Sequence, residues 1–454
     1  MRVVYIDIDS LRPDHLGCYG YERPTTPNID RLAQEGIRFE QAYTTNSPCM
    51  PSRAALISGM FGIKNGVVTH GSRGEILHRQ YSTLPFVLRQ HRIPAAAITS
   101  FGRHPSPWFY VGWNDFLDPI DRPELSFQQV AGQEVMDRAL QWLKDHRDTP
   151  DFYLYVQMWD PHSVYEAPQS FVDAVRNDNY PAHPTPEQVQ AHQKDSFWHS
   201  APAMGIHSYE DWKRMIDEYD GEIRYADHQV GRLLDALKAF EADGDLVVIL
   251  SADHGEEHGE HGVYVEHWTV HDGTQRVPLI VRDSRRKGKT ETFGGLVYQI
   301  DITATICDAF GIEPLQHWDG ASLLKQVTKE VPMRSYIVCE HGLYTAQRAV
   351  ITPEWKFIRT YHPGIWDIPP IQLFARNDAW EQHNLANEYP KVVEELDHLL
   401  RNWEEEHRDG LDPAMINAAE TPHGATYAES WTRKFQQDKV PMPIHFEQRK
   451  PEVR

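Results

Sequence analysis

The stretch Leu246-Val-Val-Ile-Leu-Ser-Ala-Asp-His-Gly255 is a run of five apolar residues followed closely by a carboxylate and an imidazole. A short, continuous apolar run that is bounded by polar residues is typical of a strand buried on both faces. Such strands occur in parallel sheets that are covered by helices on both sides. This stretch therefore predicts an α/β fold, with polar side chains placed at the carboxyl end of a central strand.

Other apolar runs repeat the pattern along the first 330 residues, where they alternate with segments of helical period. We predict further strands at residues 3–6, 95–99, 152–156 and 277–281, and helices at 27–35, 135–143 and 223–237. Strands and helices in alternation indicate a mainly parallel sheet sandwiched by helices.

The pattern changes after about residue 330. Short strands predicted at 335–339, 348–351 and 356–360 follow one another without helices between them, and a helix is predicted at 391–403. We therefore expect a main domain at residues 1–330 and a smaller C-terminal α+β subdomain at 331–419. Residues 420–454 have no clear period, and we expect them to form a tail packed on the surface.

The composition narrows the classes of partner. The chain has 45 Lys and Arg against 66 Asp and Glu, a net charge of −21, which argues against nucleic acid or an anionic membrane as the main partner. A hydrophobic content of 40% excludes a disordered chain. If the ligand is a small anion, positive charge has to be gathered locally, by a metal ion or a few arginines.

The ends and cysteines of the chain give an expectation about its compartment. No apolar run approaches the roughly 20 residues of a membrane span. The first ten residues resemble a core strand more than a signal peptide, so we expect a cytoplasmic protein unless a leader was removed. In such a compartment the four cysteines are expected to be free thiols.

Charged and imidazole side chains follow four of the predicted strands. In open parallel sheets, ligands bind beyond the carboxyl ends of the strands. Carboxylates with a minority of imidazole there would suit a hard divalent cation. The alternative for each single Asp is that it caps the next helix. The four places are Asp7 with Asp9, Arg103 with His104, Asp160 with His162, and Asp253 with His254.

The segment Cys49-Met-Pro-Ser-Arg53 stands at the start of a predicted helix that Gly59 ends. The N-terminus of a helix favours an anion, and Arg53 lies one turn along. A thiol at Cys49 is therefore expected to have a lowered pKa and to be nucleophilic. The alternative is an ordinary buried, structural cysteine.

Cys49-Met-Pro-Ser-Arg53 resembles the C-x-P-S-R signature of type I sulfatases. The resemblance covers most of the chain, through blocks at residues 8–36, 158–165, 251–262, 276–281 and 372–386. It implies an alkaline-phosphatase-like α/β fold in which residues 1–330 are the catalytic domain. It also implies one divalent metal ion, Ca²⁺ more than Mn²⁺. Cys49 would be converted by a formylglycine-generating enzyme to formylglycine, whose hydrated form is the nucleophile.

The resemblance assigns roles residue by residue. The metal ligands would be Asp9, Asp253, His254 and residue 49 itself. Arg53 would hold the oxygens of the nucleophile, His162 would act on the substrate side, and His104 would help to eliminate sulfate. The substrate-binding candidates are Arg103, His70 and His267.

Two positions depart from the family pattern. Ser10 stands where many sulfatases have a second Asp, and Asp7, one pleat back, is a weaker candidate for that role. The usual Lys after the Asp253-His254 block has no clear match, and His267 is our candidate for its place. Ser10 raises an alternative, because related phosphonate monoester and phosphodiester hydrolases also lack the second Asp.

The leading hypothesis is hydrolysis of a sulfate ester, carried by a carbohydrate or another small organic molecule. The alternative is a phosphonate monoester or phosphodiester hydrolase that uses the same site. A third hypothesis, from another class, is a catalytically silent binding protein. The expected partners are a small anionic substrate and the maturation enzyme, and a homo-oligomer is left open.

Overall fold

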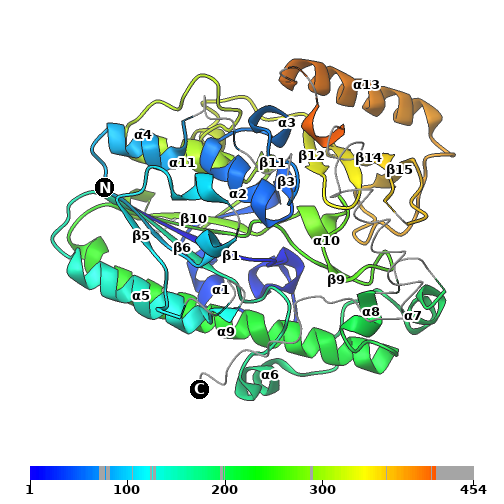
Figure 1. The fold of residues 1–454 in the computed structure, drawn as a ribbon, viewed down its shortest axis with the longest axis horizontal. Coiled ribbons are helices and arrows are strands. Elements are labelled where there is room, and N and C mark those ends of the chain that lie inside the picture. Colours follow the sequence, from blue (N-terminus) through cyan, green and yellow to red (C-terminus); the bar gives the residue numbers. More distant parts are fainter. Residues whose placement is uncertain are drawn as a thin grey trace.

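The computed structural model describes residues 1–70, 77, 82–104, 106–122, 125, 129–194, 198, 200–286, 290–364, 366–408, 410 and 412–415. Its centre is an eight-stranded sheet with the order β11-β2-β10-β7-β1-β6-β4-β5 (Figure 1). The strands are β1 (Arg2–Ile8), β2 (Ile37–Tyr43), β4 (Ala95–Ile98), β5 (Asp115–Leu117), β6 (Phe152–Met158), β7 (Leu246–Ser251), β10 (Leu279–Asp283) and β11 (Glu291–Tyr298).

The sheet is mainly parallel, which confirms the predicted fold class. β1 pairs in parallel with both β6 and β7, and every residue of these three strands is buried. One strand runs against the others, since β10 is antiparallel to both β7 and β2. The three central strands therefore carry their carboxyl ends to one edge of the sheet, where ligands of such folds bind.

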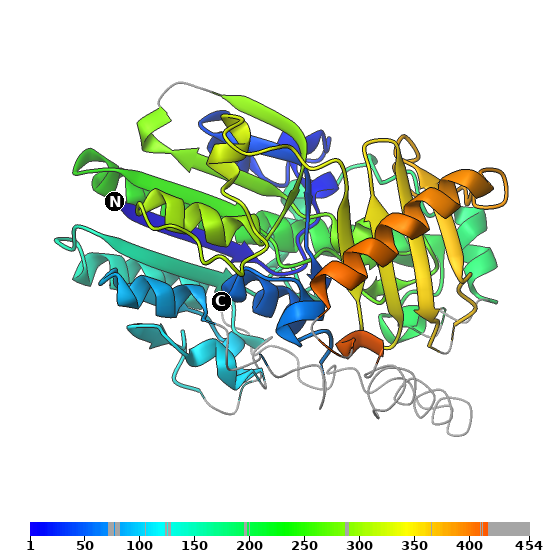
Figure 2. The same ribbon diagram turned by 90° about the horizontal axis from the view of Figure 1, so that it is seen from above.

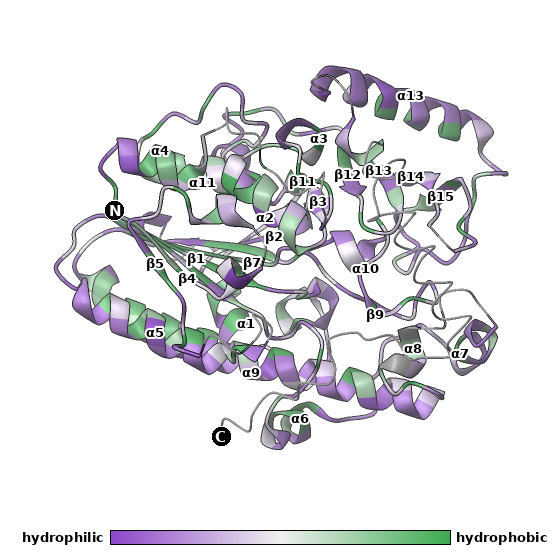
Figure 3. Cartoon of the chain, viewed as in Figure 1, coloured by the Kyte–Doolittle hydropathy of each residue, from purple (hydrophilic) through white to green (hydrophobic). Residues whose placement is uncertain are grey.

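Helices cover both faces of this sheet (Figures 1 and 2). One face carries α1 (Pro27–Gln34), α5 (Gly132–Asp145) and α9 (Tyr209–Ala242), and the other carries α2 (Cys49–Ser58), α4 (Leu84–Gln90) and α11 (Asp301–Ala309). Figure 3 shows hydrophobic colouring on the central strands and mixed colouring on the long helices. This arrangement explains why the central strands are continuous apolar runs, whereas the helices are amphipathic.

A second sheet follows in the C-terminal part of the chain. Its antiparallel strands are β12 (Ile337–His341), β13 (Ala346–Ile351), β14 (Trp355–His362) and β15 (Ile371–Ala375). The helix α13 (Pro390–His407) packs against it through Leu396, Leu400 and Trp403. The short strand β3 (Asn46–Ser47) joins this sheet beside β12, so the second sheet holds the segment that leads into Cys49.

The connecting segments hold shorter elements. They are α3 (Gly62–Asn65), α6 (Gln169–Val175), α7 (Pro186–His192), α8 (Ser200–Ala203), β8 (Glu257–His258), β9 (Tyr264–Glu266), α10 (Asp272–Gln275) and α12 (Leu323–Val327). None of the helices in the described part of the chain has both the length and the apolar character of a membrane span. The tail expected at 420–454 lies outside the described residues, and the domain boundaries stay predictions.

Candidate active site

Four predicted ligands meet at the carboxyl edge of the main sheet. Asp9 follows β1, Asp253 and His254 follow β7, and Cys49 is the first residue of α2. The ligand-type atoms of these four side chains all lie within 4.8 Å of one another, and all four residues are buried. Strands distant in sequence are adjacent in the sheet, which is why residues separated by about half of the chain converge here.

Arg53 is fully buried and lies against the carboxylates of this cluster. Its Nη1 donates to Oδ2 of Asp9 at 2.9 Å and to Oδ2 of Asp253 at 2.7 Å, and its Nε donates to Oδ2 of Asp7 at 3.1 Å. Three ionised carboxylates against one guanidinium leave two negative charges without compensation. A buried charge excess of this kind is costly unless a cation neutralises it.

The pKa values of the three carboxylates reflect the same burial and excess of negative charge. Burial raises the pKa of Asp253 to about 8, and Arg53 offsets only part of that effect. Burial likewise raises the pKa of Asp7 and of Asp9 to about 6. A divalent cation carries the charge that this cluster lacks, so the residues present fit such an ion, with carboxylate oxygen as the main ligand type.

His254 is oriented as a metal ligand would be. Its Nδ1 lies 2.7 Å from the carbonyl oxygen of Gly255, and because a carbonyl only accepts, Nδ1 carries the proton. The lone pair is then on Nε2, which lies 3.2 Å from Sγ of Cys49. Metal-binding histidines commonly fix their second nitrogen on a backbone carbonyl in this way.

Cys49 does not have the lowered pKa that its place at a helix N-terminus predicts. Burial raises the pKa of its thiol well above the usual value, and the charges of Asp9 and Asp253 raise it further. The prediction was wrong because desolvation and two carboxylates outweigh the helix end and Arg53. An unmodified, protonated thiol at this place would be a poor nucleophile.

Two predicted histidines lie together on the α2 side of the site. The rings of His70 and His104 have centroids 4.8 Å apart, and Nε2 of His70 accepts the backbone N–H of Met50 at 3.2 Å. Burial lowers the pKa of His70 well below its usual value, so this ring is neutral at pH 7.

Two more predicted histidines lie on the β7 side. The ring centroid of His267 is 4.4 Å from that of His254 and 5.8 Å from that of His162. One ring nitrogen of His267 also lies within 4.8 Å of Sγ of Cys49 and of a ring nitrogen of His254. Burial lowers the pKa of His162 and of His267 to about 4.

The structure does not turn Arg103 toward this cluster. Its guanidinium forms an ion pair with Asp118 and donates to the carbonyl oxygens of Ile120, Arg122 and Leu125. These contacts occupy the guanidinium of Arg103, so we assign it no substrate contact. Asp160, which follows β6, accepts the N–H of Gly132 at the start of the preceding helix α5, at 2.7 Å, so it bonds to the end of an earlier helix and not to that of the next one.

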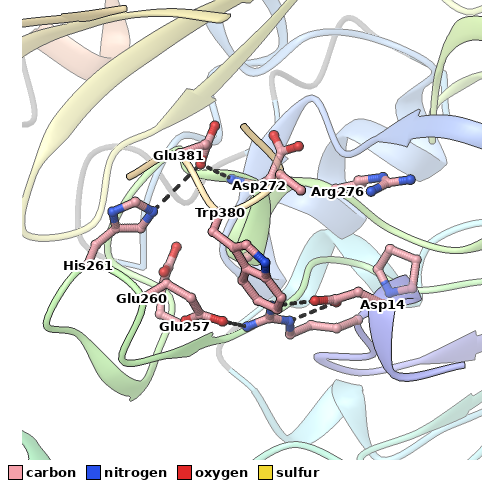
Figure 4. Close-up of a pocket in the computed structure, with 12 residues that line it drawn as sticks. Asp14, Glu257, Glu260, His261, Asp272, Arg276, Trp380 and Glu381 are labelled. Carbon is pink, nitrogen blue, oxygen red and sulfur yellow. Dashed lines mark hydrogen bonds and ion pairs between the residues drawn. The ribbon is translucent and has the colours of Figure 1, made fainter. Parts of the chain in front are cut away.

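His261 and Glu381 line a pocket that does not include Cys49 (Figure 4). His261, His271 and Glu381 have ligand atoms within 4.8 Å of one another. The two imidazoles, however, stack with centroids 3.7 Å apart, whereas two rings on one tetrahedral ion would be about 5 Å apart. Glu381 already pairs with Lys356 at 2.8 Å, so we assign no ion to this group.

The ion pair between His261 and Glu381 has a pH-dependent consequence. Burial lowers the pKa of His261, but the nearby carboxylates of Glu381 and Glu257 outweigh it, and the net pKa is raised. A raised folded-state pKa gives stability that is present below the unfolded pKa and lost as pH rises through the folded one.

We therefore expect His261→Gln to lower the free energy of unfolding by on the order of 1 kcal/mol near pH 6 and by much less near pH 9. Chemical denaturation at both pH values measures the difference. His91→Gln, at an exposed position, is the control and should give no such difference. An equal loss at both values would show that the charge of His261 does not stabilise the fold.

The protein is thus an α/β protein whose buried cluster of ligand-type side chains lies at the carboxyl edge of its main sheet. A family model described as Sulfatase matches residues 2–312, which is more than half of the chain. The chain therefore belongs to the sulfatase family.

The relatives whose names state an activity are distant from this chain in sequence. An N-acetylglucosamine-6-O-sulfatase of Bacteroides thetaiotaomicron is 23% identical, over 91% of this chain and 87% of its own length. A solved protein bound to its substrate D-glucosamine-2-N,6-O-disulfate has a TM-score of 0.74 at 20% identity, covering 90% of this chain and 99% of that one. The phosphonate monoester hydrolase of Agrobacterium radiobacter has a TM-score of 0.70 at 20% identity, covering 89% and 96%. These structural likenesses show the fold alone.

Proposed function

We propose that the protein hydrolyses the sulfate ester of a sulfated sugar or a similar small organic sulfate. The observation that carries the proposal is Cys49-Met-Pro-Ser-Arg53 at the start of α2, facing Asp9, Asp253 and His254, in a chain of the sulfatase family. The names of the glucosamine-sulfate relatives support a sugar as the carrier of the sulfate.

The metal would be held by Asp9, Asp253, His254 and residue 49. A divalent ion there would act as a Lewis acid on a sulfate oxygen and on the nucleophile. The majority of oxygen ligands favours Ca²⁺, with Mn²⁺ second, over zinc. Asp253 is held for this role by the backbone N–H groups of Ser10 and His254, at 3.2 and 2.9 Å.

The nucleophile would be residue 49 after a formylglycine-generating enzyme has converted Cys49. Hydrated formylglycine supplies a hydroxyl as the nucleophile. The unmodified cysteine would stay protonated, because the pKa of its thiol is raised. Arg53 is immobile beside it, because its guanidinium lies 4.9 Å from the ring centroid of Phe101 and 5.4 Å from that of Trp159. It therefore provides fixed positive charge next to the reacting oxygens.

His162 and His104 would exchange protons with the leaving group and with residue 49. The Nδ1 of His162 donates to the carbonyl of Ser163 at 2.7 Å, so proton exchange runs through its Nε2. His70, which is neutral and anchored on the N–H of Met50, would contact the substrate without adding charge. A neutral imidazole can take a proton near pH 7, and the negative charge of a bound substrate would raise its pKa and help it to give the proton back.

A second candidate function is hydrolysis of phosphonate monoesters or phosphodiesters. The observation that favours it is Ser10, whose Oγ donates to Oδ1 of Asp9 at 3.0 Å and replaces the carboxylate of many sulfatases. Both substrate classes present a monoanionic group, so the same cluster could bind either.

A substrate panel tests the proposal. It should contain sulfated monosaccharides, a sulfamate, an aryl sulfate, a phosphonate monoester and a phosphodiester, offered to converted and metal-loaded protein. We expect the highest kcat/KM for a sulfated monosaccharide. Preference for the phosphonate or phosphodiester would establish the second candidate, and no turnover of any member would point to a binding protein.

A further inference from the structure

A buried carboxylate lies beside His267. Glu256 is fully buried, two residues after His254, and its Oε2 accepts the phenol O–H of Tyr165 at 2.5 Å. Its other oxygen, Oε1, lies 3.6 Å from Nδ1 of His267. Tyr165 thus fixes one carboxylate oxygen and leaves the second directed toward the imidazole.

Neither of these two facing atoms has a hydrogen-bond partner among the described residues. Oε1 of Glu256 and Nδ1 of His267 are both buried and both unsatisfied. Leaving either atom unpaired is costly, and each is the complementary partner that the other needs. A shift of about 0.8 Å would bring them to charge-assisted hydrogen-bond distance, and catalytic hydrogen bonds often tighten when the substrate complex forms.

We infer that Glu256 is a positioning residue of the active site, which accepts Nδ1–H of His267 and so presents the Nε2 lone pair of His267 to residue 49. The inference rests on the proposed function, because it assigns His267 a place in the same reaction. It adds Glu256 and Tyr165, which do not belong to the cluster of metal-ligand candidates.

This arrangement decides what His267 can do. A carboxylate only accepts hydrogen bonds, so it selects the imidazole form with the proton on Nδ1. Nε2 of His267 is then an acceptor that can receive a hydroxyl proton from residue 49 or from a sugar. A lysine ammonium could only donate. A histidine at this position therefore differs from the family's lysine in its hydrogen-bonding role as well as in its charge.

Substitutions at Glu256 test the inference through turnover. We expect Glu256→Ala to lower kcat by about 10- to 100-fold with little change in KM. Glu256→Gln should lose less, because its amide oxygen still accepts Nδ1–H. In a His267→Ala background, Glu256→Ala should have no further effect. Equal losses with and without His267 would overturn the inference.

Glu257→Gln is the matched control. Glu257 is the adjacent residue and is equally buried, but its Oε1 accepts hydrogen bonds from Thr269 and Thr274. It lines the pocket of His261 and Glu381. This variant should leave kcat and the state of His267 unchanged. If it reproduces the effect of Glu256→Ala, the loss comes from general disturbance of the 255–260 loop, and the inference fails.

A spectroscopic readout separates this inference from the proposed function. In protein labelled with ¹⁵N-histidine, the His267 signals, identified by their loss in His267→Gln, should show protonated Nδ1 and unprotonated Nε2. In Glu256→Ala this preference should disappear. Protonated Nε2 in the unsubstituted protein would overturn the inference, even if sulfate esters are turned over. The expected tautomer in a protein without sulfatase activity would instead leave the positioning intact and refute the function.

Discussion

Replacing Cys49 with alanine is expected to lower kcat for sulfate esters by at least about 10⁴-fold, because it removes the residue that would become the nucleophile. Cys49→Ser is expected to be equally inactive as unconverted serine, because a serine side chain has no second hydroxyl that could expel sulfate from the covalent intermediate. Folding should be little affected, because the substitution removes a single buried sulfur atom beside Asp253 and His254. Steady-state assays with circular dichroism on the same preparations measure both effects.

Cys307→Ala is the control for this pair. Cys307 is also a buried cysteine, but it lies in α11 and packs in the main hydrophobic core. It should lose stability through a small cavity while kcat stays unchanged. Mass spectrometry of the peptide that contains residue 49 should find the aldehyde when a maturation enzyme is co-expressed. Full turnover by protein with an intact thiol would contradict the mechanism.

Replacing Asp253 with alanine is the second large expected effect, with a loss of kcat/KM of at least about 10³-fold. The substitution removes a proposed metal ligand and also frees Nη1 of Arg53 from one of its two carboxylates. Metal-free protein should fold nearly as well as before, because Asp7 and Asp9 still pair with Arg53. Because burial raises the pKa of Asp253 to about 8, this carboxyl is mostly protonated in metal-free protein at pH 7, and its loss changes the charge there little.

Calorimetric titration with Ca²⁺ and with Mn²⁺ separates binding from catalysis in this experiment. We expect Asp253→Ala to weaken binding of the preferred ion by at least about tenfold. Chelation of the unsubstituted protein should abolish turnover, and the same ion should restore it. Turnover that persists after chelation, with no metal found by elemental analysis, would refute the metal assignment.

Sequence predicted the central strands well, and the physical reason is their burial. β1, β6 and β7 are buried along their whole length, so they are continuous apolar runs. β2 and β11 were not predicted. β2 mixes buried and partly exposed residues, and polar side chains such as Arg38 and Glu40 interrupt its apolar pattern. The first half of β11 is partly or fully exposed, and only its last four residues are buried. Single-sequence periodicity cannot separate such strands from loops.

The cluster of metal-ligand candidates could also be predicted from the sequence, because the carboxyl ends of parallel strands meet at one edge of a sheet. What sequence could not show were properties that depend on three-dimensional surroundings. Two such properties are the ion pair that holds Arg103 on Asp118 and the raised pKa of Cys49. Glu256 gave a sequence signal, since it follows Asp253-His254 closely, but only the structure shows that it faces His267.

The most direct test of the central claim compares two substrates that share one leaving group. Protein with residue 49 confirmed as formylglycine, and loaded with Ca²⁺, should be assayed on an aryl sulfate and on the matching aryl phosphonate monoester. We expect a higher kcat/KM for the sulfate, by at least about tenfold, and loss of both activities in Cys49→Ala. A higher kcat/KM for the phosphonate would contradict the assignment as a sulfuric ester hydrolase.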